Sequence, residues 1–269
     1  MTSTGPEGHP VLRGDELREV LVIPGGFWRD VRVVAETGST NLDLLASAAD
    51  GAAEGTVLAA ESQTAGRGRM GRQWVSPPGA ALTFSVLLRP ATVPQASRGW
   101  LPLLVGVAAA QAVRAATGVD ASLKWPNDVQ VKGAKLAGIL AEQAGDAIVV
   151  GIGMNVSSGR DELPVVTATS LALEGARDVA AGPLLIAMLG ELGRWYQAWA
   201  GARGDAVACG LHREYQALCA TLGREVRVSL PGGRTVTGVA AGVDQTGRLV
   251  VGSAAGPIPV SAGDVIHVR

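Results

Sequence analysis

The chain has 269 residues, a formal net charge of −1, 47% hydrophobic residues and 17% charged residues. This length fits one large domain or a larger domain with a smaller one, and the composition supports a packed core and argues against a disordered chain. The near-zero net charge creates no overall field that would attract nucleic acid.

Local features narrow the class of protein further. The longest apolar stretch, Leu101–Ala110, covers half a membrane span and contains Pro102, so we expect no transmembrane helix. The N-terminus lacks a basic segment followed by an apolar run and a small-residue cleavage site, which predicts a cytoplasmic protein. Cys209 and Cys219 fit neither a zinc motif nor a disulfide framework, so we expect buried or half-buried thiols.

The histidines are placed away from the motifs described below. They are His9, His212 and His267. This distribution disfavours acid–base catalysis centred on histidine, and it disfavours a histidine metal site.

In chain order, residues 1–30 are predicted to form a lead-in with one helix around Asp15–Val22, too short for a winged-helix DNA-binding domain. Alternating strands and helices follow. A turn over 37–41 can cap a helix that begins near Leu42, and Gly99–Thr117 has the pattern of a second helix. The strands expected in this part are Val31–Ala35, Thr56–Glu61 and Ala81–Leu88.

The next segments complete the predicted sheet. Leu136–Glu142 and Ala147–Met154 are strands joined by a tight turn, so we expect them to pair antiparallel. Two helices are predicted over Pro183–Ala200 and Asp205–Thr221. Three aromatic residues in this region are candidates for the core or an interface: Trp195, Tyr196 and Trp199. The pattern as a whole predicts an α+β fold, a mixed β-sheet backed by helices.

The pattern changes after Leu222, where short strands alternate with Gly-rich turns. The expected strands are Glu225–Leu230, Arg234–Val243, Arg248–Gly252, Pro257–Val260 and Val265–Val268. About 45 residues of this kind predict a small β-barrel. We therefore expect a catalytic domain over 31–222 and a C-terminal domain over 223–269.

The most distinctive motif is Gly66–Trp74, called the Arg/Gly loop here, in which three arginines alternate with three glycines before a tryptophan. Guanidinium groups recognise carboxylate and phosphate with paired hydrogen bonds, glycine allows close approach of the backbone, and tryptophan can stack on a flat ring. Because it links two predicted strands, we expect a loop that closes on an anionic ligand such as a nucleotide. A solvated charged loop, or a generic phosphate or RNA contact, is the alternative.

Four weaker motifs each have a structural alternative. Lys124–Asp128 is good turn chemistry, but it also brings polar groups close to buried segments. Lys135–Leu140 sets a lysine before a strand with a central glycine, which suits either a phosphate contact or an ordinary surface lysine. Gly151–Val156 is weak as a dinucleotide fingerprint and better explained as a strand that leads to Asn155. Gly38–Asn41 can cap a helix or hold a neutral polar ligand.

Taken in order, these motifs resemble the biotin protein ligase family, in the form without an N-terminal DNA-binding domain. The resemblance covers about residues 31–200, and the β-rich tail resembles that family's C-terminal SH3-like domain. It implies a catalytic domain like that of class II synthetases and biotin ligases. It also implies that ATP and biotin form biotinyl-5′-adenylate, with Mg²⁺ as cofactor, and that biotin passes to a lysine of a biotin carboxyl carrier protein domain of an acyl-CoA carboxylase.

The resemblance also assigns roles by position. It implies that three residues are catalytic: Arg67, Arg69 and Lys135. It implies a biotin site formed by Ser39, Thr40, Asn41, Gln63, Arg67, Gly68, Arg69, Lys135 and Gly138. It implies an ATP site formed by Arg69, Arg72, Trp74, Asn127, Lys135 and Asn155, with Trp74 and Asn155 near the adenine and Asp128 assisting through magnesium.

Other activities remain as alternatives. A lipoate–protein ligase shares this chemistry and, by resemblance, the catalytic fold, although the Arg/Gly loop and Lys124–Asp128 favour biotin. A non-enzymatic nucleic-acid-binding module is disfavoured by the net charge and by the lack of basic residues in the tail. With about 30 residues before the first motif, we expect neither repressor activity nor DNA binding, and we expect no membrane partner.

Overall fold

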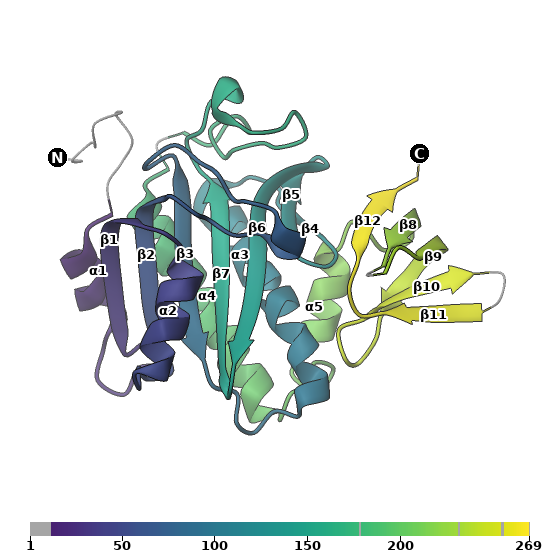
Figure 1. The fold of residues 1–269 in the computed structure, drawn as a ribbon, viewed down its shortest axis with the longest axis horizontal. Coiled ribbons are helices and arrows are strands. Elements are labelled where there is room, and N and C mark those ends of the chain that lie inside the picture. Colours follow the sequence, from purple (N-terminus) through teal and green to yellow (C-terminus); the bar gives the residue numbers. More distant parts are fainter. Residues whose placement is uncertain (1–11, 178, 231, 254–255, 269) are drawn as a thin grey trace.

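The computed structural model describes residues 12–177, 179–230, 232–253 and 256–268, so His9 and part of the predicted lead-in lie outside the described residues. The described chain forms a seven-stranded mixed sheet flanked by helices and a separate five-stranded antiparallel sheet beside it (Figure 1). The prediction of a mixed, helix-backed sheet followed by a small β-rich unit is confirmed.

The large sheet has the strand order β1-β2-β3-β7-β6-β5-β4. Its strands are β1 Asp30–Thr37, β2 Thr56–Gln63, β3 Ala81–Leu88, β4 Ser122–Lys124, β5 Asp128–Val131, β6 Ala134–Ala144 and β7 Ala147–Asn155. β1 and β2 are parallel because a helix crosses between them, and every other neighbouring pair is antiparallel. β3 and β7 are buried along their whole length, which fits their nearly continuous apolar sequences.

The helices cover the two faces of this sheet unequally. They are α1 Gly14–Leu21, α2 Thr40–Ala49, α3 Leu101–Thr117, α4 Ala181–Gly201 and α5 Leu211–Leu218. α3 and α4 pack on each other behind the sheet in Figure 1, whereas α2 lies alone on the front face beside β7. The front of β6 and β7 is therefore left for loops to cover, and the candidate site forms there.

α3 is the central helix of the core. With the 3₁₀ turn before it, Gln95–Thr117 is long and apolar enough to cross a membrane by length and composition alone. However, 67% of its most apolar window is buried inside this fold. Trp195, Tyr196 and Trp199 on α4, which the sequence offered as core or interface residues, are buried in the core. The hydrophobicity of α3 is accounted for by packing against α4 and the sheet.

The predicted helix over Asp205–Thr221 is wrong in its first half. The helix begins only at Leu211, and the chain before it forms turns. Gly204 and Gly210 adopt left-handed backbone angles, with φ of +83° and +81°, which end regular helix on either side of this segment. The carboxylate of Asp205 accepts two backbone N–H groups there and stabilises the turn.

The cysteines and the described histidines serve the fold. Cys209 is half-buried and Cys219 is buried, as expected, and both are free thiols. Burial raises the pKa of the Cys209 thiol, which keeps it protonated and poorly nucleophilic at neutral pH. Nε2 of His212 lies 2.8 Å from the carbonyl oxygen of Val243. In the described ranges, no group of three or more His, Cys, Asp or Glu side chains is placed to hold a metal ion.

The second sheet has the order β11-β10-β9-β8-β12 and is antiparallel throughout. Its strands are β8 Glu225–Ser229, β9 Thr235–Val243, β10 Leu249–Ser253, β11 Gly256–Val260 and β12 Asp264–His267. Five short strands are what the sequence predicted for this region. The domain boundary near 222–224 stays a prediction, and the first strand of this sheet starts at Glu225.

Two buried tryptophans fix the second sheet against the first. Nε1 of Trp100 donates to the carbonyl of Gln245 at 2.9 Å, and Nε1 of Trp125 donates to the carbonyl of Gly247 at 3.2 Å. Both acceptors lie in the turn between β9 and β10. Gly99 lets this turn approach closely, because a Cβ there would lie 2.7 Å from the carbonyl oxygen of Thr246. This docking brings β12 to the edge of the open face of the large sheet.

Candidate active site

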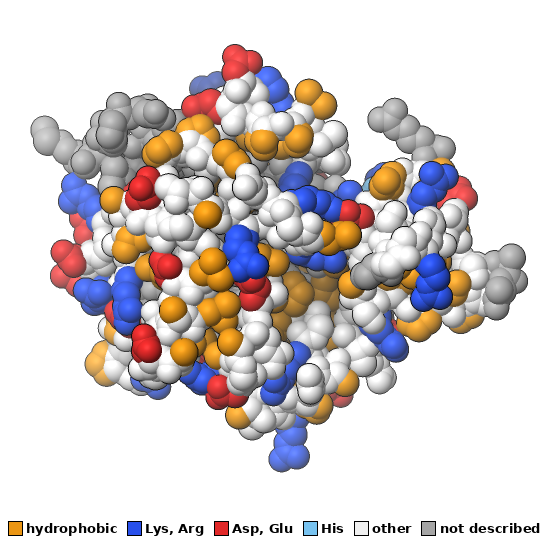
Figure 2. Space-filling view, viewed as in Figure 1, with side chains coloured by type: hydrophobic (Ala, Val, Ile, Leu, Met, Phe, Trp, Pro, Cys, Tyr) orange, Lys and Arg blue, Asp and Glu red, His pale blue; other side chains and the backbone are white. Residues whose placement is uncertain are grey.

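A cavity of about 320 Å³ lies over β6 and β7, between the start of α2, the Arg/Gly loop and β12. Figure 2 shows the molecule hollowed between the large sheet and the C-terminal sheet, with basic side chains near the border of the hollow. The predicted site residues that line the cavity are Ser39, Thr40, Asn41, Gln63, Arg67, Gly68, Arg69, Arg72, Trp74, Asn127, Asp128, Lys135 and Gly138. Motifs spread over about 100 residues thus converge on one concave site.

The floor of the cavity is made by glycines on neighbouring strands. Gly153 on β7 pairs with Gly138 on β6, and a Cβ on Gly153 would lie 2.6 Å from Nε1 of Trp74. The indole therefore lies directly on the backbone of the sheet. Its buried Nε1 has no hydrogen-bond partner among the described residues. The Gly-x-Gly sequence at 151–153 is explained by close packing and needs no dinucleotide fingerprint, as the sequence interpretation favoured.

Gly138 has a packing role that the sequence did not specify. A Cβ there would lie 3.1 Å from Nζ of Lys135 and 3.5 Å from Cζ3 of Trp74. In this structure the space above Gly138 is thus taken by two other predicted site residues. A direct contact between Gly138 and biotin stays a prediction.

One wall of the cavity is a buried network of neutral polar groups. Oε1 of Gln63 accepts from the backbone N–H of Thr40 at 2.8 Å and from its hydroxyl at 3.1 Å. The hydroxyl of Ser85 lies 2.7 Å from Oγ1 of Thr40 and 2.6 Å from Oδ1 of Asn41. Ser39 is buried beside them at the start of α2, and its side chain makes no capping hydrogen bond. Such a prearranged set of donors and acceptors suits a neutral polar ligand group.

The Arg/Gly loop is a short hairpin between β2 and β3. Arg67 and Gln73 form an isolated antiparallel bridge, and the N–H of Gly68 donates to the carbonyl of Arg72 at 2.7 Å. A Cβ on Gly66 would overlap the carbonyl oxygen of Trp74, so glycine is required for the two arms to meet. The hairpin carries its arginines across the mouth of the cavity.

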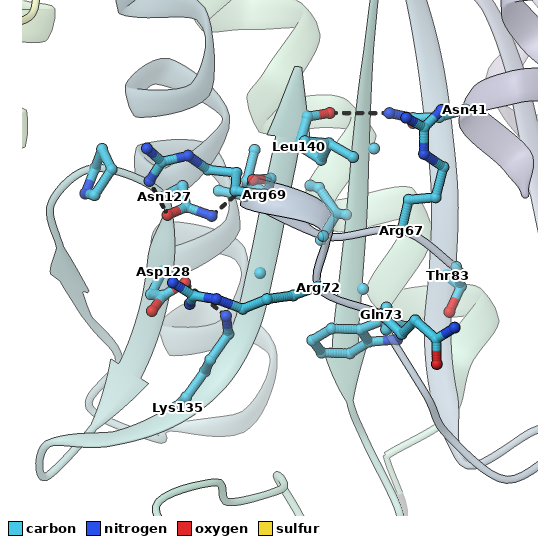
Figure 3. Close-up of a pocket in the computed structure, with 18 of the residues that line it drawn as sticks. Asn41, Arg67, Arg69, Arg72, Gln73, Thr83, Asn127, Asp128, Lys135 and Leu140 are labelled. Carbon is cyan, nitrogen blue, oxygen red and sulfur yellow. Dashed lines mark hydrogen bonds and ion pairs between the residues drawn. The ribbon is translucent and has the colours of Figure 1, made fainter. Parts of the chain in front are cut away.

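The three guanidinium groups of this hairpin each have an internal partner. Arg67 forms an ion pair of 3.0 Å with Glu142, Arg69 donates to Oδ1 of Asn127 at 2.9 Å, and Arg72 pairs with Asp264 of β12. Figure 3 shows Arg67 pointing toward Asn41 and Arg69 toward Asn127, from opposite sides of the loop.

Arg69 is the most enclosed of these three cations. Burial lowers the pKa of its guanidinium, while the nearby carboxylates of Asp264 and Asp128 act in the opposite direction. An arginine side chain stays charged at neutral pH even after such a shift. Arg69 is therefore a fixed positive charge inside the cavity.

Lys135 and Asp128 line the same cavity and form an ion pair there. Nζ of Lys135 lies 2.8 Å from Oδ1 of Asp128. The backbone of Lys135 is held on both sides, because its N–H donates to Thr167 and its carbonyl accepts from Thr169, each at 2.8 Å. The backbone of Lys135 is thus fixed in position. Its ammonium group points along the cavity toward the Arg/Gly loop (Figure 3).

The Lys124–Asp128 motif forms the turn between β4 and β5, so both sequence interpretations of it are correct in part. It is a turn, and it also carries cavity residues. Nδ2 of Asn127 donates to the carbonyl of Ile139 at 2.9 Å, while its Oδ1 accepts from Arg69. Asn127 thereby connects the Arg/Gly loop to β6.

Asn155 is the one predicted site residue that the structure does not bring to the cavity lining. Its Nδ2 donates to the carbonyl of Thr169 at 2.9 Å, and its own carbonyl accepts from Leu171 at 3.1 Å. Asn155 therefore holds the segment that pairs with Lys135. Its proposed contact with adenine stays a prediction.

The sequence did not single out three residues that complete the site: Ser85, Glu142 and Asp264. Ser85 is one of two hydroxyl residues, with Thr83, inside a mostly apolar strand, and Glu142 shares the cavity-facing side of β6 with Gly138, so both carried a local signal. Asp264 reaches the site only because the second sheet docks on the first. No local pattern could have indicated that.

The contact between Arg72 and Asp264 can be measured without any ligand. In a double-mutant cycle on thermal unfolding, Arg72→Ala and Asp264→Ala should show a coupling energy of about 0.2–1 kcal/mol that falls with added salt, because the side chains are 58% and 37% exposed. The same cycle on the surface pair Arg114 and Asp120 is the control. A coupling of zero at low salt would mean that β12 does not restrain the Arg/Gly loop.

The fold and the cavity together define a class of enzyme. Basic side chains and neutral polar groups line the same cavity, which suits a ligand that carries both a neutral head and reacting anionic groups; the basic residues are Arg67, Arg69, Arg72, Lys124 and Lys135. The cavity lining contains no Ser, Cys or His poised as a nucleophile with a base. This arrangement is that of a ligase that activates a carboxylic acid with a nucleotide.

Comparisons with known proteins specify the family. Residues 36–157 match the Biotin/lipoate A/B protein ligase family, and residues 221–268 match the Biotin protein ligase C terminal domain. The chain is 43% identical over 264 residues to the biotin–[acetyl-CoA-carboxylase] ligase of Mycobacterium tuberculosis, covering 97% of both proteins. It is 33% identical over 244 residues to the ligase of that name from Paracoccus denitrificans, covering 87% of this chain and 98% of the relative.

Solved structures agree with these relatives. The biotin protein ligase of Aquifex aeolicus in complex with biotin and ATP has a TM-score of 0.76 and 28% identity, covering 90% of this chain and all of that one. The Leishmania major biotin protein ligase in complex with biotinyl-5-AMP has a TM-score of 0.60 and 25% identity, covering 87% and 99%. The chain belongs to the biotin protein ligase family.

Proposed function

We propose that this chain is an ATP-dependent biotin–protein ligase. It forms biotinyl-5′-adenylate from biotin and ATP and then transfers biotin to a lysine of a biotin carboxyl carrier protein domain. The observation that carries the proposal is the convergence of a neutral polar wall and five Lys and Arg side chains on one cavity. The named relatives and the biotin and ATP complexes of similar structures support it.

The cations suit the chemistry of both steps. In the first step a biotin carboxylate oxygen bonds to the α-phosphorus of ATP, and the bond from that phosphorus to pyrophosphate breaks. The approach brings like charges together, so prearranged cations lower its barrier. In the second step the neutral amine of the carrier lysine attacks the acyl carbon, the bond from that carbon to AMP breaks, and the nitrogen releases one proton to solvent. Neither step requires a nucleophilic side chain of the enzyme.

Biotin is proposed to bind with its neutral head against the buried network and its carboxylate toward the arginines. Thr40, Asn41 and Gln63 supply the hydrogen-bonding groups of that network, and Ser39 is buried beside them. Four further residues would enclose the carboxylate and the chain that leads to it: Arg67, Gly68, Arg69 and Gly138. Lys135 would hydrogen-bond the reacting oxygens from the opposite side.

ATP is proposed to lie between the Arg/Gly loop and the turn at 125–128. Its phosphates would contact Arg69, Arg72 and Lys135, and its sugar or base would contact Asn127. Trp74 presents a ring on the cavity floor, suited to packing near the adenine. Magnesium is held in many such sites by one or two carboxylates together with phosphate oxygens and water. Asp128 fits that limited role, and the ion would neutralise phosphate charge.

The proposal extends to partners and location. The acceptor is a biotin carboxyl carrier domain of an acyl-CoA carboxylase, and we propose that the chain works in the cytoplasm without binding DNA or a membrane. We also propose the division into a catalytic domain over 31–222 and a C-terminal domain over 223–269. We also propose that the C-terminal domain helps to close the ATP site. The ion pair between Asp264 of this domain and Arg72 of the Arg/Gly loop supports this role.

Transfer of labelled biotin to a purified carrier domain tests the function. We expect labelling that requires ATP and magnesium, and no labelling of a carrier whose acceptor lysine is replaced by arginine. Biotin, and not lipoate, should support exchange of pyrophosphate into ATP. Exchange supported by lipoate alone would assign the chain to the other branch of the matched family, and exchange with neither acid would refute a ligase.

A further inference from the structure

Glu142 lies on β6 two residues before the strand ends, just beyond the β6 residues that line the cavity, and it joins two parts of the site. Its Oε2 accepts from Nδ2 of Asn41 at 2.8 Å, and its Oε1 pairs with the guanidinium of Arg67 at 3.0 Å. We propose that Glu142 is a positioning residue that orients the Asn41 amide and holds Arg67 beside the cavity until the carboxylate of biotin replaces it. This inference rests on the proposed function.

The orientation of the Asn41 amide follows from the hydrogen-bonding properties of a carboxylate. An ionised carboxylate only accepts hydrogen bonds, so it forces the Nδ2 side of the Asn41 amide to face β6. The carbonyl of Leu140 accepts from the same Nδ2 at 3.2 Å, and the hydroxyl of Ser85 lies 2.6 Å from Oδ1. Asn41 is only 4% exposed, so a reversed amide would leave buried groups mismatched.

The exchange of partners at Arg67 follows from the exposure and geometry of its ion pair with Glu142. The side chain of Arg67 is 45% exposed and that of Glu142 is 19% exposed, and ion pairs near the surface contribute little net stability. The carboxylate of a ligand can therefore replace Glu142 beside Arg67, because the guanidinium can donate its N–H groups to either carboxylate. After the exchange, Glu142 keeps its hydrogen bond to Asn41 and does not become an unpaired buried charge.

In the ligand-free structure, the carboxylate of Glu142 thus occupies the position on Arg67 that the carboxylate of biotin would take. Figure 3 shows the result: Arg67 lies over the Asn41 end of the cavity and away from Asn127 and Asp128. A glutamate that only stabilised the end of β6 would not need to contact both the amide of Asn41 and the guanidinium of Arg67, two groups that line the cavity.

Two variants and two ligands separate this role from a structural one. In Glu142→Gln, the amide oxygen can still accept from Asn41, but Arg67 loses its charged partner. Binding of biotin, measured by calorimetry, should strengthen, by roughly up to fivefold, because the ligand no longer competes with Glu142. Binding of biotin methyl ester, which lacks the negative charge, should stay within about twofold. Glu142→Ala also removes the acceptor for Asn41 and should weaken both ligands, by roughly tenfold or more.

A ligand-free measurement tests the same idea independently of biotin. Trypsin cleavage after Arg67, followed by mass spectrometry, should accelerate in Glu142→Gln by roughly up to fivefold, because the arginine is released. Asp146→Asn is the matched control, since Asp146 pairs with Arg89 at the far end of the β6–β7 hairpin. It should change neither cleavage after Arg67 nor binding.

The outcomes distinguish this inference from the proposed function. Wild-type protein that binds neither biotin nor its ester would refute the function, and the cleavage experiment would still decide the role of Glu142. Unchanged cleavage in Glu142→Gln would overturn the inference. So would equal changes in the affinities for biotin and its ester, since that result would mean that Glu142 does not compete with the ligand's carboxylate.

Discussion

Replacing Lys135 by alanine should slow formation of biotinyl-5′-adenylate by roughly 10²- to 10³-fold, the effect typical of losing one prearranged donor at a charged transition state. The structure supports a loss of this size because the ammonium group is held in place. Its Nζ lies 2.8 Å from Asp128, and its backbone is hydrogen-bonded to Thr167 and Thr169. A cation fixed in this way need not reorganise as charge develops on the reacting oxygens.

The measurement is pyrophosphate exchange together with single-turnover adenylate formation. Lys132→Ala is the matched control, because Lys132 lies on the adjoining turn, is 83% exposed and pairs with Glu174 away from the cavity. It should keep wild-type rates. Thermal unfolding should show that Lys135→Ala remains folded, since its side chain is 35% exposed. Wild-type adenylation by Lys135→Ala would remove this lysine from the mechanism.

The sheet that carries the site could be predicted closely, because its strands have strong local signals. β3 and β7 are nearly continuous apolar segments, and the turn at 145–146 is short enough to require antiparallel pairing with β6. The same local logic failed over 205–210. There Gly204 and Gly210 end the helical pattern through left-handed angles that residue periodicity does not register.

The contents of the cavity could be predicted in part. The motifs identified nearly all of its polar residues, since charge, amide groups and glycine are visible in the sequence. The use of each group could not be predicted, because it depends on neighbours across the sheet. Gly138 and Gly153 are 15 positions apart, yet their pairing creates one floor for Trp74. Asp264 needed the docking of a second sheet, which no short pattern encodes.

Gly151 offers the sharpest test of the buried network. A Cβ on Gly151 would overlap Oδ1 of Asn41 and lie 3.1 Å from Oγ of Ser85. In Gly151→Ala, the Asn41 side chain must therefore move, and its hydrogen bonds to Ser85 and Glu142 cannot both survive. Leaving buried polar groups unpaired costs about 1–3 kcal/mol. We expect the affinity for biotin to fall by roughly 10- to 100-fold and the protein to remain folded.

Two further variants separate the network from the added bulk. Gly190→Ala adds the same methyl group at an exposed position of α4 with no neighbour within 4 Å, and it should leave biotin binding unchanged and slightly stabilise the helix. Ser85→Ala adds no bulk but removes the hydroxyl beside Asn41 and Thr40. It should weaken biotin binding in the same direction as Gly151→Ala. If Ser85→Ala bound biotin like the wild type, the loss in Gly151→Ala would reflect steric exclusion alone, and the neutral wall would not be the recognition element.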